Sequence, residues 1–397
     1  MPFLFSILVV LISLVSVVFP ALIASSNSTI SDLNEFGIEL LEVDPFSIGF
    51  WALALVAANI VVFGIAILYF KNKLPRFISK SLEFIFNFEV SKKNSFLIIV
   101  LLLAIYVASS AGDLFTEEEW EDYSGVKQRI ESWSPEQITT KFEPHVRYFL
   151  LWSSFVLFEN YTIIPFIASI SLLLLTYFLT AKISKKRFAG IIAFLILIQS
   201  NIFLTYDSTV SYTNFWILFY LLSLYLVYKI WPLSPVSYLL SIPSKTLTVL
   251  FLPMSLFFIY RSEISRKRKI ILASSTLAII LAGALAAIGG FSIGAATGTT
   301  EEFDWEEFWL GFSSFSYQLR FDGLVILFIL PLIVGLFVAS RSGIKIADSL
   351  MVLIGGILLT APLLTGFTDQ TNQPYRFVPL VVFFAVGVGV LLSKRKN

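Results

Sequence analysis

Long apolar stretches, separated by short polar segments, recur along the whole chain. Contiguous apolar residues predict helices, because a membrane strand would alternate apolar and polar positions. Most of the stretches are long enough for a helix to cross a hydrocarbon core of about 30 Å. The pattern predicts an all-α, polytopic transmembrane bundle of about 11–12 spans. The predicted spans cover residues 3–24, 47–70, 95–112, 161–181, 188–205, 213–229, 231–243, 244–260, 270–292, 322–340, 347–366 and 376–393.

Two of these stretches have more than one interpretation. Residues 231–243 are few and contain Pro232, Pro235 and Pro243, which predicts a tilted or broken span. Residues 3–24 are followed by small side chains and predict either a cleaved signal peptide or an uncleaved anchor. We expect the anchor, since no Lys or Arg precedes the stretch.

The composition agrees with a membrane environment. Hydrophobic residues make up 57% of the chain and charged residues 14%, whereas soluble domains carry about 25% charged residues. The chain has no cysteine, which excludes disulfides, thiolate nucleophiles and cysteine-ligated metals. Because His145 is the single histidine, a metal would need carboxylate ligands, and these suit a divalent cation such as Mg²⁺ or Mn²⁺.

The basic residues are distributed unevenly between the polar segments. Of the 28 Lys and Arg residues, 21 lie in one alternating set of loops, which we assign to the cytoplasm. The acidic segments 25–46, 113–160 and 293–321 then face the other side. We expect an integral membrane protein of a prokaryotic plasma membrane, with its active site on the external face. The cytoplasmic set consists of 71–94, 182–187, the segment around 229, 261–269, 341–346 and the tail from 394.

The long external segment 113–160 carries the first candidate residue. Asp113 directly follows the span 95–112, so its carboxylate is held near the membrane interface. Residues 126–133 and 146–158 have helical spacing and predict helices that lie in the interface plane. We therefore predict that the segment forms a roof over a site next to Asp113.

Further acidic residues offer a partner for Asp113. The run from Glu117 to Asp122 is most simply a solvated surface, with Glu117 kept as a further catalytic candidate. Asp207 lies in the short external turn 205–209 and faces the same compartment as Asp113. Two such carboxylates can share a cation or divide the work of base and orienting group. The alternative is that Asp207 only caps the next helix.

Four residues are candidates for binding a substrate. Lys245 and Arg376 are external cations at membrane depth, where they can hold a lipid phosphate or simply extend toward water. Tyr375 precedes Arg376 and is assigned to the same site. His145 follows an acid and a proline and is either an interfacial hydrogen-bonding residue or a direct substrate ligand.

A recognisable order of segments emerges from these features. It comprises an acid that ends a span (Gly112–Asp113), a His/Pro-then-aromatic stretch (143–152), a span entry with proline (160–169), a basic turn (182–190), an external turn with Asp (200–212) and a turn with Lys (244–246). This order resembles the GT-C class of membrane glycosyltransferases. It is most similar to the family 39-like branch, which contains protein O-mannosyltransferases and aminoarabinose transferases. The likeness covers about residues 96–260 and, weakly, 373–380. The chain departs from the family in lacking an adjacent acidic pair, because Leu114 follows Asp113.

The resemblance implies a fold, a chemistry and a division of the chain. Such enzymes move a sugar from a polyprenyl (dolichyl) phosphate to a glycan, lipid or protein acceptor outside the cytoplasm. Asp113 would be the base, and the external cations would bind the leaving phosphate. Residues 95–397 would form the catalytic domain, preceded by two spans with an acidic external loop in 1–94. Membrane lipids are expected partners and nucleic acid is not, while metal dependence stays open.

Two other functions fit the same pattern. A transporter or lipid flippase would carry broken helices and charges within its spans, and the prolines of 231–243 are the feature in its favour. A non-catalytic scaffold would use the external loops for binding. The enzyme alone requires Asp113, Asp207 and Arg376 to meet in one external cavity.

Overall fold

A computed structural model describes residues 3–22, 51–119, 122–134, 145–288, 303–305, 308, 322–366 and 374–393. The described part of the chain is helical and contains no strand. Every apolar stretch predicted to be a span contains a helix, or short helices in succession. The prediction of an all-α protein is therefore confirmed.

Four helices in the described ranges are long and apolar enough to cross a membrane. They are α4 (Ala52–Phe70), α6 (Lys92–Ser110), α9 (Ile163–Ser184) and α17 (Gly323–Arg341). Large apolar side chains point outward on two of them: Leu53 of α4 is 77% exposed and Phe96 of α6 is 67% exposed. Contiguous exposed apolar surface of this kind is unfavourable in water and suits hydrocarbon.

The chain folds as two compact units. We call Met1–Phe88, Ser200–Ile202 and Thr300–Asn397 the terminal unit, and Glu89–Gln199 and Phe203–Thr299 the central unit. The residues from 300 onward are therefore grouped with the first 88 residues in one compact unit. The division expected from the resemblance, 1–94 and 95–397, concerns function and stays a prediction.

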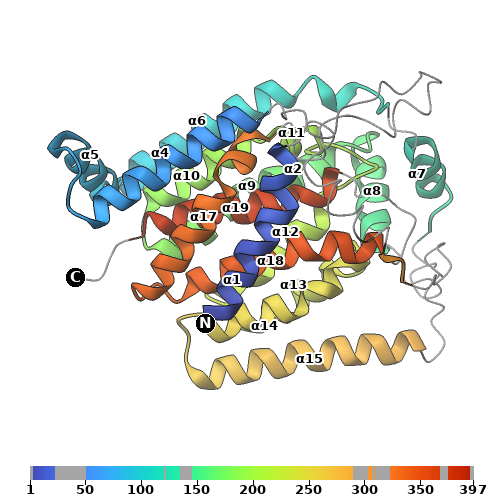
Figure 1. Cartoon of the computed structure of the whole chain (residues 1–397). Coiled ribbons are helices and arrows are strands. Elements are labelled where there is room, and N and C mark those ends of the chain that lie inside the picture. Colours follow the sequence, from blue (N-terminus) through green and yellow to red (C-terminus); the bar gives the residue numbers. More distant parts are fainter. Residues whose placement is uncertain are drawn as a thin grey trace. The chain divides into compact units, whose positions relative to one another are not determined.

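The terminal unit is organised around α17. This helix packs against α4, α18 and α19, and α1 packs against α17 and α18 (Figure 1). Almost every residue of α19 is buried, so this helix is the core of the unit. The unit's elements are α1 (Phe3–Ser13), the π-helical η1 (Leu14–Val18), α2 (Phe19–Leu22), α4, α5 (Arg76–Asn87), α17, α18 (Ile346–Thr365), the 3-10 helix η7 (Pro374–Phe377) and α19 (Val378–Leu391).

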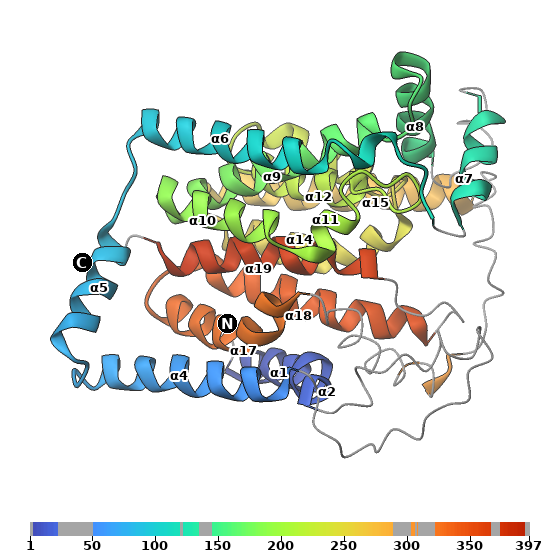
Figure 2. The same ribbon diagram turned by 90° about the horizontal axis from the view of Figure 1, so that it is seen from above.

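The central unit is organised around α9, which packs against α8, α10 and α12 (Figure 2). Outside this group, α6 packs on α10, while α13 packs on α12 and α15. Residues 231–241 form only short helices, as the prolines predict. The unit's elements are α6, η3 (Asp113–Phe115), α7 (Asp122–Glu131), α8 (His145–Phe158), α9, α10 (Arg187–Ile198), most of α11 (Asn201–Thr205), α12 (Phe215–Leu226), η5 (Trp231–Leu233), α13 (Ser234–Ser241), η6 (Thr246–Phe251), α14 (Leu252–Arg261) and α15 (Arg266–Ile288).

Local sequence determines where the helices of the central unit begin and end. The Ser91 Oγ accepts a hydrogen bond from the Asn94 N–H at 3.2 Å and caps α6. Lys185 adopts a left-handed conformation with φ of 61° and ends α9, so that the chain turns directly into α10. Gly190 permits close packing there, since a Cβ at this position would lie 2.8 Å from the Tyr177 carbonyl oxygen.

Replacing Gly190 with Ala is expected to destabilise the central unit. The added methyl group meets the backbone of Tyr177, which cannot rotate away. Overpacking of this kind costs about 1–3 kcal/mol. Thermal unfolding in detergent should show a lower melting temperature for Gly190→Ala. The control is Gly64→Ala in α4, where a Cβ meets nothing within 4 Å and the better helix former should leave the melting temperature unchanged or slightly higher. Equal melting temperatures for the two variants would contradict the close contact.

Candidate functional site

Asp207 is the most deeply buried carboxylate among the predicted site residues, with 2% of its surface exposed. It lies in the loop between α11 and α12. The Tyr106 hydroxyl donates to Asp207 Oδ2 at 2.8 Å, and the Ser110 Oγ donates to the same oxygen at 3.0 Å. Tyr106 and Ser110 are four residues apart on α6 and therefore share one face of that helix. The end of α6 thus supplies a pair of hydroxyl donors for this carboxylate.

The environment of Asp207 changes its acidity. Burial raises the pKa of Asp207 from its ordinary value of 3.8 to about 6. The hydrogen bonds from Tyr106, Ser110 and Ser208 act in the opposite direction, because they stabilise the charged form, and the negative charge of Asp113 contributes to the rise. Perturbed carboxylates of this kind cluster at functional sites.

Asp113 lies at the end of α6 that holds Asp207. It begins η3, three residues after Ser110, and its side chain is exposed. The carbonyl oxygen of Asp113 accepts a hydrogen bond from the Thr116 Oγ1 at 3.0 Å, which shapes the turn after the helix. The structure therefore brings together the exposed Asp113 carboxylate and the buried Asp207 carboxylate, whose pKa is raised further by the charge of Asp113.

Two side chains hold the backbone of the loop that carries Asp207. The Glu118 carboxylate accepts hydrogen bonds from the Val210 N–H and, at 3.1 Å, from the Ser211 N–H. It also accepts from the Ser211 Oγ at 2.8 Å. Arg147 donates from Nη2 to the carbonyl oxygens of Val210, at 3.0 Å, and Ser211. The backbone N–H and carbonyl groups of Val210 and Ser211 are thus all satisfied by charged side chains, which make strong hydrogen bonds.

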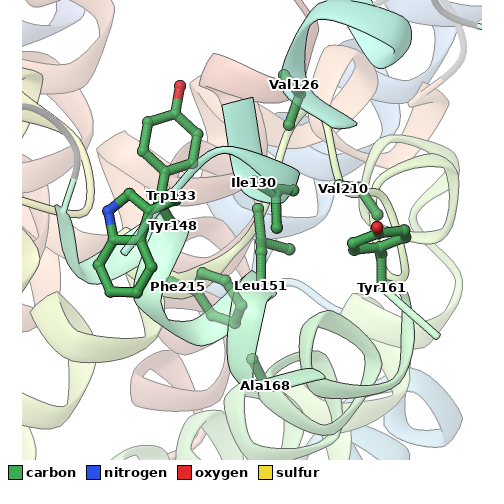
Figure 3. Close-up of a cluster of buried hydrophobic side chains, with 9 residues drawn as sticks. All are labelled: Val126, Ile130, Trp133, Tyr148, Leu151, Tyr161, Ala168, Val210 and Phe215. Atoms are coloured by element: carbon green, nitrogen blue, oxygen red, sulfur yellow. The ribbon is translucent and has the colours of Figure 1, made fainter. Parts of the chain in front are cut away.

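An apolar cluster supports the same loop from within the central unit. Val210, with no exposed surface, packs among side chains from α7, α8, α9 and α12 (Figure 3). In the close-up, the Val210 side chain lies next to Tyr161, which stands in the segment between α8 and α9. The cluster joins α7 and α8 to the Asp207 loop. Its members are Val126, Ile130, Trp133, Tyr148, Leu151, Tyr161, Ala168, Val210 and Phe215.

The described acidic residues from Glu117 to Asp122 differ in exposure and in hydrogen bonding. Glu118 binds the Asp207 loop, and Asp122 Oδ2 accepts a hydrogen bond from the Tyr212 hydroxyl at 2.8 Å. Glu117, the catalytic candidate in this run, has an 80% exposed side chain and lies 3.4 Å from Lys127 Nζ. Exposed ion pairs of this kind contribute at most about 1 kcal/mol. The solvated interpretation is thus wrong for the half-buried Glu118, whereas Asp122 is exposed, as that interpretation predicts.

Asp207 does not cap the helix that follows it. The residue before α12 is Asn214, whose side chain donates to Ser169 Oγ at 3.1 Å and to the Tyr206 carbonyl at 3.0 Å. The capping alternative for Asp207 is therefore wrong.

The predicted substrate-binding residues fall in different parts of the molecule. In the central unit, half-buried Lys245 places its Nζ 5.5 Å from the centre of the Trp216 ring. In the terminal unit, η7 contains Tyr375 and Arg376, whose guanidinium carbon lies 5.9 Å from the Tyr375 ring. His145 is the first residue of α8, and its side chain lies outside the described part of the chain. A common cavity for Asp113, Asp207 and Arg376 stays a prediction, because Arg376 belongs to the other unit.

The terminal unit contains a buried carboxylate that the sequence analysis missed. Asp322 precedes α17, is 4% exposed and accepts a hydrogen bond from the Ser200 hydroxyl. The sequence did contain a signal for this carboxylate, because Asp322 is the first residue of the predicted span 322–340. Its partner, Ser200, is 122 residues away in the sequence, and nothing in the pattern indicates that pairing.

The acidic side chains of the described residues offer few ligands for a metal ion. The described ranges contain no group of three or more acidic or histidine side chains close enough to hold an ion. Asp113 and Asp207 remain the two carboxylates that a Mg²⁺ or Mn²⁺ ion could use, although Asp207 Oδ2 already accepts two hydroxyl groups.

Neither a protein-family model nor any curated protein or solved structure matches the chain. Function is therefore inferred from the side chains and their geometry.

The burial of Asp207 predicts a pH-dependent stability. Because the folded-state pKa is raised, Asp207 stabilises the fold in acid, and this contribution is lost as the pH rises from about 4 to about 6. The full change amounts to roughly 3 kcal/mol. Melting temperatures in detergent at several pH values should show that loss in the unaltered protein and not in Asp207→Asn. Glu119→Gln, an exposed change in the same external segment, should follow the unaltered protein. Identical pH profiles for Asp207→Asn and the unaltered protein would contradict the buried site.

Proposed function

We propose that the chain is a membrane glycosyltransferase. It moves a sugar from a polyprenyl (dolichyl) phosphate donor to an acceptor on the non-cytoplasmic face. The observation that supports this function is the pairing of exposed Asp113 with buried Asp207 at one end of α6. The resemblance to the GT-C class, in its family 39-like branch, points to the same chemistry at the same residues.

The proposal includes a place in the membrane. The helices would form about 11–12 spans, of which the four long apolar helices are the clearest. The excess of Lys and Arg in the other set of loops favours an external location for Asp113 and Asp207, in a membrane that we propose to be a prokaryotic plasma membrane. Helices α7 and α8, which pack on the Asp207 loop, would then lie at the membrane interface.

In the proposed reaction, Asp113 acts as the general base. Its exposed carboxylate takes the proton of an acceptor hydroxyl while the acceptor oxygen attacks the anomeric carbon of the donor. The bond between that carbon and the phosphate oxygen breaks, and the polyprenyl phosphate leaves with the electron pair. Asp207 is a positioning residue, held by the Tyr106 and Ser110 hydroxyl groups at the end of α6 from which the chain continues to Asp113.

The leaving phosphate needs positive charge. Lys245 of the central unit and Arg376 of the terminal unit, next to Tyr375, are the candidates for this role. An ammonium or guanidinium group binds phosphate through charge-assisted hydrogen bonds. His145, at the start of α8, would contact the donor or the acceptor.

A proton-coupled transporter is the second candidate function. A buried carboxylate with a pKa of about 6, bound by Tyr and Ser hydroxyls, is also suited to carry a proton. The two functions differ in a direct assay. Purified transferase releases sugar from a polyprenyl phosphate donor in detergent, where no gradient exists, and a transporter or a scaffold does not.

Replacing Asp113 with Asn should abolish most of the transfer. A general base contributes about 100- to 10,000-fold to the rate, so kcat should fall by that range. The control is Glu119→Gln, which changes an exposed acid in the same segment and should retain full activity. Transfer of a radiolabelled sugar measures both. Wild-type kcat in folded Asp113→Asn would rule out Asp113 as the base.

Replacing Lys245 or Arg376 with Ala should weaken donor binding. A charge-assisted hydrogen bond contributes about 1.5–3 kcal/mol, so the apparent KM for the donor should rise at least tenfold while kcat changes little. Lys229→Ala, an exposed cation after α12, is the matched control and should leave KM unchanged. An unchanged donor KM in either test variant would remove that residue from phosphate binding.

A further inference from the structure

Helix α5 (Arg76–Asn87) has two chemically distinct sides. Along a helix with 3.6 residues per turn, Phe77, Phe84 and Ile85 fall on one side. Arg76, Lys80, Glu83 and Asn87 form a polar stripe beside that side, and the half-buried Ile78, Leu82 and Phe86 occupy the remaining arc of the helix. Such a strongly amphipathic pattern is typical of helices that lie in a membrane interface.

The apolar side of α5 is exposed. No residue of the helix is buried. Phe77 is 81% exposed, and Phe84 is 65% exposed. The Phe84 and Phe88 rings, one turn apart, lie with their centres 5.3 Å from each other and extend the apolar side beyond the helix end. Aromatic side chains of this size bury a large area when they find a partner.

The place of α5 in the chain indicates what covers this side. The helix lies in the segment between α4 and α6, two of the helices long enough to cross a membrane. A helix of 12 residues is too short to cross, so both spans end at the same membrane face. Within the terminal unit, α5 turns away from the direction of α4 (Figures 1 and 2). A helix so oriented at the end of a span runs along the membrane surface.

The charge around α5 indicates the chemistry of that surface. Lys71, Lys73, Arg76 and Lys80 are all exposed. The segment 71–94 contains six Lys and Arg residues and two acids, Glu83 and Glu89, so its net charge is +4. The net charge beside the apolar side is therefore strongly positive, which attracts anionic headgroups.

We propose that α5 binds an anionic phospholipid surface at the cytoplasmic face. Its phenylalanines insert below the headgroups, and the four exposed cations contact lipid phosphates. The inference rests on the membrane placement in the proposed function and is independent of the transfer reaction.

The experiment uses the full chain, which has no native cysteine. Single-cysteine variants Phe84→Cys, on the apolar side, and Glu83→Cys, on the polar side, are labelled with a fluorescent dye. Each is reconstituted into phosphatidylcholine vesicles, with or without phosphatidylglycerol. Brominated lipid chains quench a dye within the membrane, and aqueous iodide quenches a dye in water.

The proposal expects opposite results from the two variants. The Phe84→Cys dye should be quenched by brominated chains and protected from iodide, and the Glu83→Cys dye should show the reverse. Brominated phosphatidylglycerol should quench the Phe84→Cys dye at least twofold more than brominated phosphatidylcholine at equal mole fraction. Changing Lys71, Lys73, Arg76 and Lys80 to Gln should remove that preference, since each cation near an anionic surface is worth about fivefold in partitioning.

Three results would overturn the proposal. Equal access of iodide to both dyes would show that α5 lies in water. A Phe84→Cys dye that neither quencher reaches would show that protein, such as a second copy of the chain, covers the apolar side. Quenching without preference for phosphatidylglycerol would exclude anionic headgroups as the ligand. None of these readings involves sugar transfer, so each is separable from failure of the transferase proposal.

Discussion

The peptide groups of Val210 and Ser211 impose the constraint on which the candidate site depends. The Val210 side chain is wholly buried in an apolar cluster, so this stretch of backbone needs hydrogen-bond partners within the protein. Glu118 accepts from the two N–H groups, and Arg147 donates to the two carbonyls. An unpaired buried group would cost about 1–3 kcal/mol. The loop that carries Asp207 is therefore held by two side chains from the segment 113–160.

Helix α6 connects that loop to the exposed carboxylate. Its last turns present Tyr106 and Ser110 to Asp207, and the chain continues directly into Asp113. Rotation of the helix by one residue would move both hydroxyl groups away from the loop. Ser91 caps the start of the same helix, which defines where it begins. The relation between the two carboxylates thus depends on the length and phase of a single apolar helix.

The helices could be predicted from the sequence, and part of the site could not. Contiguous apolar stretches fixed the position of nearly every helix, because helix formation depends on neighbours in the chain. Asp113 and Asp207 were found because each is an acid at the end of an apolar stretch. Glu118 and Arg147 were missed because their hydrogen-bond partners lie 92 and 63 residues away in the sequence. These partners are backbone groups, which every residue carries, so no residue type in the sequence indicates them. Tyr106 and Ser110 did leave a signal, as two hydroxyl residues four apart in an apolar helix.

Glu118 and Arg147 contact the same dipeptide without contacting each other through a direct ion pair in the described structure. The N–H groups bind the anion and the carbonyl groups bind the cation, and the peptide unit that joins Val210 to Ser211 is bound at both its carbonyl and its N–H. Four of the five hydrogen bonds from this dipeptide to Glu118 and Arg147 involve main-chain atoms, and the fifth comes from the Ser211 hydroxyl. A change of the side chain at position 211 would therefore remove one hydrogen bond to Glu118 and leave the four main-chain contacts that hold the Asp207 loop.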